Sequence, residues 1–136
     1  MDQILKAFPN DVRFVFKNYP LPFHPNAMPA AKAAVAAGKQ GKFWEMHDKL
    51  FQNAKELGPD KYEIWAKEIG LDIDRFKTDV ESPETSAVIT DDMKEAGKVT
   101  VRGTPTFFIN GKIPTARSFE LYKSMIEEEI KAKKKP

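Results

Sequence analysis

Four consecutive residues, Arg102, Gly103, Thr104 and Pro105, are the stretch of this sequence best suited to hold another molecule. Gly103 lets a second backbone approach closely, because glycine has no side chain. Pro105 follows the one kind of peptide bond with a realistic chance of being cis, and a loop before a cis proline exposes backbone donors and acceptors. An extended peptide could pair with them as an added strand, so we expect a polypeptide partner. The simpler interpretation is a turn followed by a buried strand, without any binding role.

Other residue types offer little for catalysis. The sequence has no cysteine, so it contains neither a thiolate nor a disulfide of its own. His24 and His47 are far apart in the sequence and lack the helical spacing of metal ligands. We expect His24 to be a loop residue and His47 to be a packing residue. Trp44 and Trp65 recur among other aromatic residues at helical intervals, which favours core packing over a cofactor site. The sequence therefore predicts no catalytic residue, no metal site and no cofactor.

Composition is ordinary for a globular domain. The chain has 136 residues, of which 41% are hydrophobic and 31% charged, and one domain is expected. The net charge is only +2, from 22 basic and 20 acidic residues, which argues against nucleic acid or a membrane surface as the main partner. No apolar run approaches the roughly 20 residues of a membrane span, and no signal peptide is recognisable. The chain is therefore either cytosolic or a piece of a longer precursor.

Two segments have the residue pattern of β-strands. In Val12–Lys17 the apolar residues Val12, Phe14 and Phe16 point to one face, and residues 13, 15 and 17 point to the other. Thr106–Ile109 is made of β-branched and aromatic residues. Asn110 and Gly111 follow the second segment, and both tolerate the positive φ that a two-residue hairpin turn requires. We therefore expect a strand near the start of the chain and a hairpin near its end.

Helical patterns fill the remainder of the chain. Asp72, Ser82 and Ser118 are expected to cap helices through their side-chain oxygens, and Pro83 suits a first helical position. The expected helices cover residues 3–8, 27–37, 41–52, 60–69, a short segment after Asp72, a segment from Ser82 to Gly97, and a last segment after Ser118.

The segment Gly103-Thr104-Pro105-Thr106-Phe107-Phe108-Ile109-Asn110-Gly111 resembles the cis-proline loop and following strand of the thioredoxin superfamily. The order of the upstream segments, including Tyr19-Pro20-Leu21 and Phe43-Trp44-Glu45-Met46-His47-Asp48, is most similar to DsbA-like thiol:disulfide oxidoreductases. This resemblance implies an α/β, thioredoxin-like fold with an inserted helical subdomain. It divides residues 1–136 into a thioredoxin core of 1–22 and 98–136 and a helical insert of 23–97. The family's first, central strand and its Cys-x-x-Cys segment would lie before Met1.

The resemblance also implies a function. DsbA-like proteins exchange disulfides with protein substrates in the periplasm or another extracytoplasmic compartment, and the loop before the cis proline holds the substrate. Arg102, Gly103, Thr104 and Pro105 would be the substrate-binding residues, while the chain by itself would be redox-inactive. The absent central strand would leave apolar strand edges exposed, which favours either direct closure of the sheet or a homodimer.

Two alternatives stay open. The first is a non-catalytic peptide-binding or chaperone-like module that uses the same cis-proline groove. The second is a relative of the kappa-class glutathione transferases, which share the insert but depend on a serine at the start of their first helix; the corresponding position is missing from this sequence.

Overall fold

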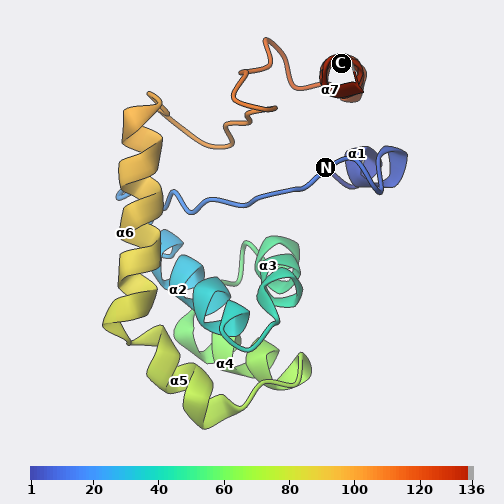
Figure 1. Cartoon of the computed structure of the whole chain (residues 1–136). Coiled ribbons are helices and arrows are strands. Elements are labelled where there is room, and N and C mark those ends of the chain that lie inside the picture. Colours follow the sequence, from blue (N-terminus) through green and yellow to red (C-terminus); the bar gives the residue numbers. More distant parts are fainter. Residues whose placement is uncertain (135–136) are drawn as a thin grey trace. The chain divides into compact units, whose positions relative to one another are not determined.

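The computed structural model describes residues 1–134, and within that range all the regular elements are α-helices (Figure 1). The chain divides into two compact units, Lys17–Arg102 and the combination of Met1–Phe16 with the chain from Gly103 onward. The helices are α1 Asp2–Ala7, α2 Ala27–Gly38, α3 Phe43–Gln52, α4 Pro59–Glu68, α5 Ile73–Val80, α6 Pro83–Lys98 and α7 Phe119–Lys134. We call Lys17–Arg102 the helical unit and the other the loop-bearing unit.

In the helical unit, α2 is the central element and packs against α3, α4, α5 and α6 (Figure 1). Ala33, Ala36 and Ala37 are fully buried, and their small side chains let neighbouring helices approach the α2 backbone. Larger side chains from the surrounding helices complete the core. The buried cluster consists of Ala33, Ala34, Ala36, Ala37, Met46, Leu50, Tyr62, Trp65, Ala66, Leu71 and Phe76.

The helix starts predicted at Asp72 and Ser82 are confirmed. The Asp72 carboxylate accepts a hydrogen bond from the Arg75 N–H at 3.0 Å, and the Ser82 hydroxyl accepts one from the Thr85 N–H at 3.3 Å. Each bond satisfies a donor that the first turn of a helix leaves without a partner.

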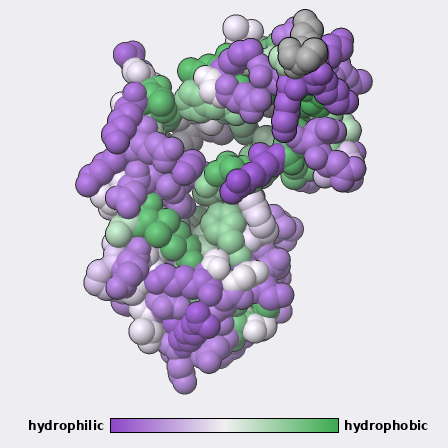
Figure 2. Space-filling view, viewed as in Figure 1, coloured by the Kyte–Doolittle hydropathy of each residue, from purple (hydrophilic) through white to green (hydrophobic). Residues whose placement is uncertain are grey.

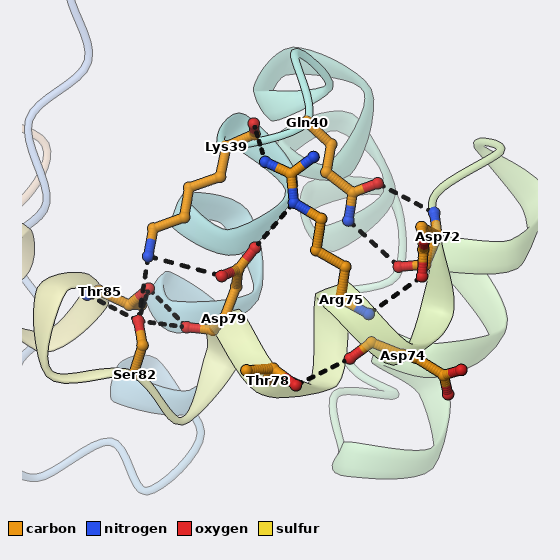
Figure 3. A network of polar contacts seen from close by, with 9 residues as sticks. All are labelled: Lys39, Gln40, Asp72, Asp74, Arg75, Thr78, Asp79, Ser82 and Thr85. Atoms are coloured by element: carbon orange, nitrogen blue, oxygen red, sulfur yellow. Dashed lines mark hydrogen bonds and ion pairs between the residues drawn. The ribbon is translucent and has the colours of Figure 1, made fainter.

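Polar contacts join the end of α2 to α5 (Figure 3). Gln40 and Asp72 exchange two hydrogen bonds, with the Asp72 N–H donating at 2.9 Å and the Gln40 side chain donating to the Asp72 carbonyl at 3.2 Å. The Arg75 guanidinium donates to the Lys39 carbonyl at 3.2 Å. Asp79 lies between two cations, 3.6 Å from Arg75 Nε and 3.8 Å from Lys39 Nζ. These contacts fix the orientation of two helices whose apolar faces meet in the core.

The loop-bearing unit has a smaller core, built between α1 and α7. Ile4, Phe8 and Ile126 are buried there, and partly buried residues including Val12, Ile109 and Tyr122 pack around them. The Ser118 hydroxyl accepts a hydrogen bond from the Leu121 N–H at 3.2 Å, as predicted for the cap of the last helix.

The two predicted strands are not formed. Residues 12–17 adopt no regular structure, and in the segment 106–109 only Ile109 makes a β-bridge, with Lys112. An alternating pattern makes a strand only where a neighbouring strand supplies a ladder of hydrogen bonds, and within residues 1–134 these two segments do not form such a ladder. The strand assignments are therefore wrong for this structure, and the α/β arrangement stays a prediction.

The predicted hairpin turn is present. Asn110 and Gly111 have φ values of 47° and 82°, and Ile109 and Lys112 exchange backbone hydrogen bonds of 2.8 and 3.0 Å. These are the features of a two-residue type I′ turn. The turn thus forms without the strands that were expected to flank it.

Burial of the aromatic residues follows the prediction only in part. Trp65 lies in the core with 6% of its surface exposed, whereas Trp44 is 41% exposed. In α3 the buried side chains are Met46 and Leu50, so Trp44 belongs to the opposite, outer side of that helix. Figure 2 shows hydrophobic patches among the predominantly hydrophilic side chains of the visible surface.

Candidate functional site

The predicted binding loop, Arg102–Pro105, includes the point in the sequence where one unit ends and the other begins. The second segment of the loop-bearing unit begins with Gly103, Thr104 and Pro105. Arg102 is the last residue of the helical unit. Arg102, Thr104 and Pro105 are exposed, Gly103 is half-buried, and the Thr104–Pro105 peptide bond is cis. The structure therefore groups three of the four candidates in one unit, and Arg102 is related to them through its covalent link to Gly103.

Two side chains hold the loop from within the same unit. The Thr106 hydroxyl donates a hydrogen bond to the Gly103 carbonyl at 2.7 Å. The Arg117 guanidinium donates to the Pro105 carbonyl at 2.9 Å. The carbonyls on either side of Thr104 thus have partners, which restrains the backbone around this residue.

The backbone of Thr104 itself is available. Within residues 1–134, neither its N–H nor its carbonyl takes part in a hydrogen bond, and the same holds for the backbone groups of Phe107 and Phe108. Because Thr104 is exposed, we expect water to hydrogen-bond to its backbone groups in the free protein. A donor and an acceptor on one residue are what an extended chain needs to add itself as a strand.

A pocket of about 160 Å³ adjoins the loop. Its lining surface is polar and apolar in nearly equal parts, and among residues 1–134 the charged residue that lines it is Arg117. The rings of Phe107 and Tyr122 pack against each other with their centres 5.6 Å apart. The lining consists of Pro105, Thr106, Phe107, Ile113, Pro114, Arg117 and Tyr122. Sequence reasoning missed Arg117, Ile113 and Tyr122, because no local pattern indicates that residues 113–122 return to the loop.

The hairpin turn is anchored to α7 by polar contacts. The Lys112 ammonium donates a hydrogen bond to Glu129, and Asn110 donates to the same carboxylate at 3.3 Å. The hydrogen bond from Lys112, followed by that from Asn110, lowers the pKa of Glu129 below its ordinary value, and the same contact with Glu129 raises the pKa of Lys112. These contacts help to fix the segment that follows the loop.

The histidines do not form a metal site. The His47 ring packs against the rings of Phe51 and Trp44, with centres 4.5 and 5.1 Å away, and its Nδ1 lies 3.1 Å from the Asp48 carboxylate. His24 stacks beside Phe23 at 4.5 Å. Among the residues that the structure describes, no group of three or more histidines and carboxylates could hold a metal ion.

Comparison with known proteins identifies the family. The model of a family described as "Thioredoxin" matches residues 3–128. Among solved structures, a thioredoxin-like oxidoreductase from Silicibacter pomeroyi DSS-3 superimposes with a TM-score of 0.75 at 27% identity, covering 96% of this chain and 75% of that one. The oxidoreductase DsbA from Xylella fastidiosa gives a TM-score of 0.72 at 27% identity, covering 96% and 78%. This chain is a DsbA-like member of the thioredoxin superfamily.

Curated relatives of this DsbA-like chain are much longer proteins. It is 42% identical over 111 residues to the Na(+)/H(+) antiporter NhaA 1 of Salinispora arenicola, and 43% identical over 102 residues to NhaA 3 of Salinispora tropica. These matches cover 81% and 74% of the DsbA-like chain but only 17% and 16% of the relatives. Within residues 1–134, none of the helices has both the length and the apolar character needed to cross a membrane.

Proposed function

We propose that this chain is the polypeptide-holding part of a DsbA-like protein disulfide oxidoreductase, with no redox activity of its own. An extended substrate would pair with the backbone of Thr104 and lie along Gly103–Pro105, with Arg102 at one end. The observation that carries the proposal is the exposed donor and acceptor of Thr104, which have no partner among residues 1–134 although both neighbouring carbonyls do.

The lack of redox activity follows from the sequence. Thiol–disulfide exchange requires attack by a thiolate, and these 136 residues contain no cysteine. Any thiol that completes the reaction must come from residues outside this sequence. We therefore expect the chain not to accelerate the reduction of insulin disulfides by dithiothreitol, compared with dithiothreitol alone.

Peptide binding is tested by changing the peptide and leaving the protein intact. We would titrate the chain into a fluorescently labelled extended peptide and follow its anisotropy. N-methylation of single backbone amides along the peptide removes one donor at a time, and each lost hydrogen bond should weaken binding by about 3- to 10-fold. Because Thr104 offers one carbonyl, pairing predicts that N-methylation weakens binding at one position, the amide that donates to this carbonyl, while the amides on either side tolerate it. Equal tolerance of N-methylation at all positions contradicts the proposal.

A binding module without any thiol chemistry is the second candidate, and the complete lack of cysteine favours it. The two candidates differ in the coding sequence immediately upstream of the Met1 codon. A strand, a Cys-x-x-Cys pair and a helix encoded there would support the oxidoreductase, whereas a stop codon or an unrelated sequence would support the module.

The finer description of the fold is part of the same proposal. We infer that a thioredoxin core of 1–22 and 98–136 surrounds a helical insert of 23–97, and that residues 12–17 and 106–109 become strands when a central strand is supplied. The support is that the two similar solved structures extend beyond the region this chain covers. Amide exchange measured with and without the added strand tests it: protection must appear in both segments.

Compartment and assembly also belong to this proposal. An extracytoplasmic location is proposed from the likeness to DsbA-like proteins. A homodimer is proposed because large apolar side chains of the loop-bearing unit are exposed, with Val15 at 54% and Ile113 at 60%. Sedimentation equilibrium over a range of concentrations tests the dimer, and a strictly monomeric mass would overturn it.

A further inference from the structure

We infer that the pocket beside the loop selects polypeptide segments in which an apolar residue lies within two positions of a glutamate or aspartate. The inference rests on the proposed function, since it assigns a preferred substrate to the same loop. It follows from the lining of the pocket and from the hydrogen bonds of Arg117.

The walls of the pocket suit an apolar side chain. Phe107 and Tyr122 present packed rings, and Ile113 is 60% exposed beside Pro114. When an apolar side chain of the peptide covers this surface, the side chain and the surface are both removed from water. This burial contributes roughly 25 cal/mol of favourable binding free energy for each Å² of apolar surface. The ring of Pro105 lies at the same pocket, so a peptide on the loop passes its opening.

Arg117 supplies the charge at this pocket. A guanidinium has five N–H donors, and the hydrogen bond to the Pro105 carbonyl uses one of them. Among residues 1–134 no carboxylate forms an ion pair with Arg117, and the residue is exposed. The remaining donors are therefore available to a ligand, and a carboxylate matches their planar, forked geometry better than any other peptide group.

The expected separation of the apolar and acidic residues in the peptide follows from the position of the Arg117 guanidinium. It lies 2.9 Å from the carbonyl of Pro105, one residue from the Thr104 backbone that pairs with the peptide. In an extended peptide consecutive residues are about 3.3 Å apart, so two positions correspond to about 7 Å. A carboxylate near the residue that fills the pocket is thus within reach of Arg117.

The test uses two labelled peptides that are identical except for a Glu→Gln change beside the apolar residue. The wild-type chain is expected to bind the glutamate peptide about 3- to 10-fold more tightly at low salt, with the preference shrinking as salt screens the charges. Arg117→Gln should abolish the preference, and Arg117→Lys should retain part of it. Lys6→Gln, which removes an exposed cation of the same unit that does not line the pocket, should leave the preference intact.

The outcomes separate the inference from the function on which it rests. Equal binding of both peptides by the wild-type chain, with the N-methyl sensitivity preserved at the one amide that pairs with Thr104, overturns the carboxylate preference and leaves the loop as a peptide site. Loss of binding to every peptide overturns both. The comparison on the wild-type protein does not depend on whether the Arg117 variants fold.

Discussion

Asp91 and Asp92 are adjacent aspartates on α6, and their surroundings differ completely. Asp92 Oδ2 accepts hydrogen bonds from the backbone N–H and the side-chain amide of Asn18, at 2.9 and 2.8 Å. Asn18 is only 6% exposed, so these donors depend on a protein partner. Asp91 is exposed. One carboxylate therefore fastens the beginning of the helical unit to α6, and its neighbour faces water.

Replacing Asp92 with alanine should destabilise the protein. The Asn18 donors would lose their acceptor while remaining largely buried, which costs about 1–3 kcal/mol in the free energy of unfolding. Urea denaturation followed by circular dichroism measures the change. Asp91→Ala is the matched control and should change the stability by less than about 0.5 kcal/mol. Equal effects of the two substitutions would show that the Asn18 contacts do not contribute.

At the scale of elements, the hairpin turn and α7 depend on each other. The turn brings Lys112 and Asn110 together, and α7 supplies Glu129 to both. The lowered pKa of Glu129 means that the folded state favours its ionised form. This contribution to stability is present above the unfolded-state pKa of glutamate and is lost as the pH falls through the lower, folded-state pKa.

Lys112→Gln should raise the pKa of Glu129 toward its ordinary value, because it removes the largest cause of the shift. The side-chain carboxyl carbon of Glu129, followed by NMR across the acid range, measures that pKa directly. Lys123→Gln is the control, since Lys123 pairs with Glu127, at 3.9 Å. An unchanged Glu129 titration in the Lys112 variant would mean that this contact does not persist in solution.

At the scale of the whole molecule, the two units differ in how the chain builds them. The helical unit is one continuous segment, Lys17–Arg102, with its own buried core around α2. The loop-bearing unit combines residues from both ends of the sequence, so its core closes a long loop. The helical unit is therefore the part that can fold from local contacts.

An isolated fragment of residues 17–102 is expected to fold alone. It retains the buried cluster, both confirmed helix caps and the Asn18–Asp92 contacts. Far-UV circular dichroism should show helix, and urea should unfold the fragment in a single cooperative transition. A fragment without a cooperative transition would show that the helical unit requires the loop-bearing unit for its stability.

Features that depend on neighbouring residues follow from the amino-acid sequence alone. Helix caps at Asp72, Ser82 and Ser118 and the Asn110-Gly111 turn could be predicted because each is decided within a few residues. The candidate loop at Gly103–Pro105 was likewise visible in its glycine and proline. These local rules describe most of the helices of the chain.

Other features depend on how distant parts of the chain pack together. The alternating pattern of residues 12–17 could not show whether another strand would pair with it, since pairing depends on distant parts of the chain. The exposure of Trp44 depended on which face of α3 meets α2. Arg117 contacts the loop through its hydrogen bond to the carbonyl of Pro105, 12 residues away, and no local pattern indicates this contact. Local preferences act within a few residues, whereas pairing and pocket formation depend on how the whole chain packs.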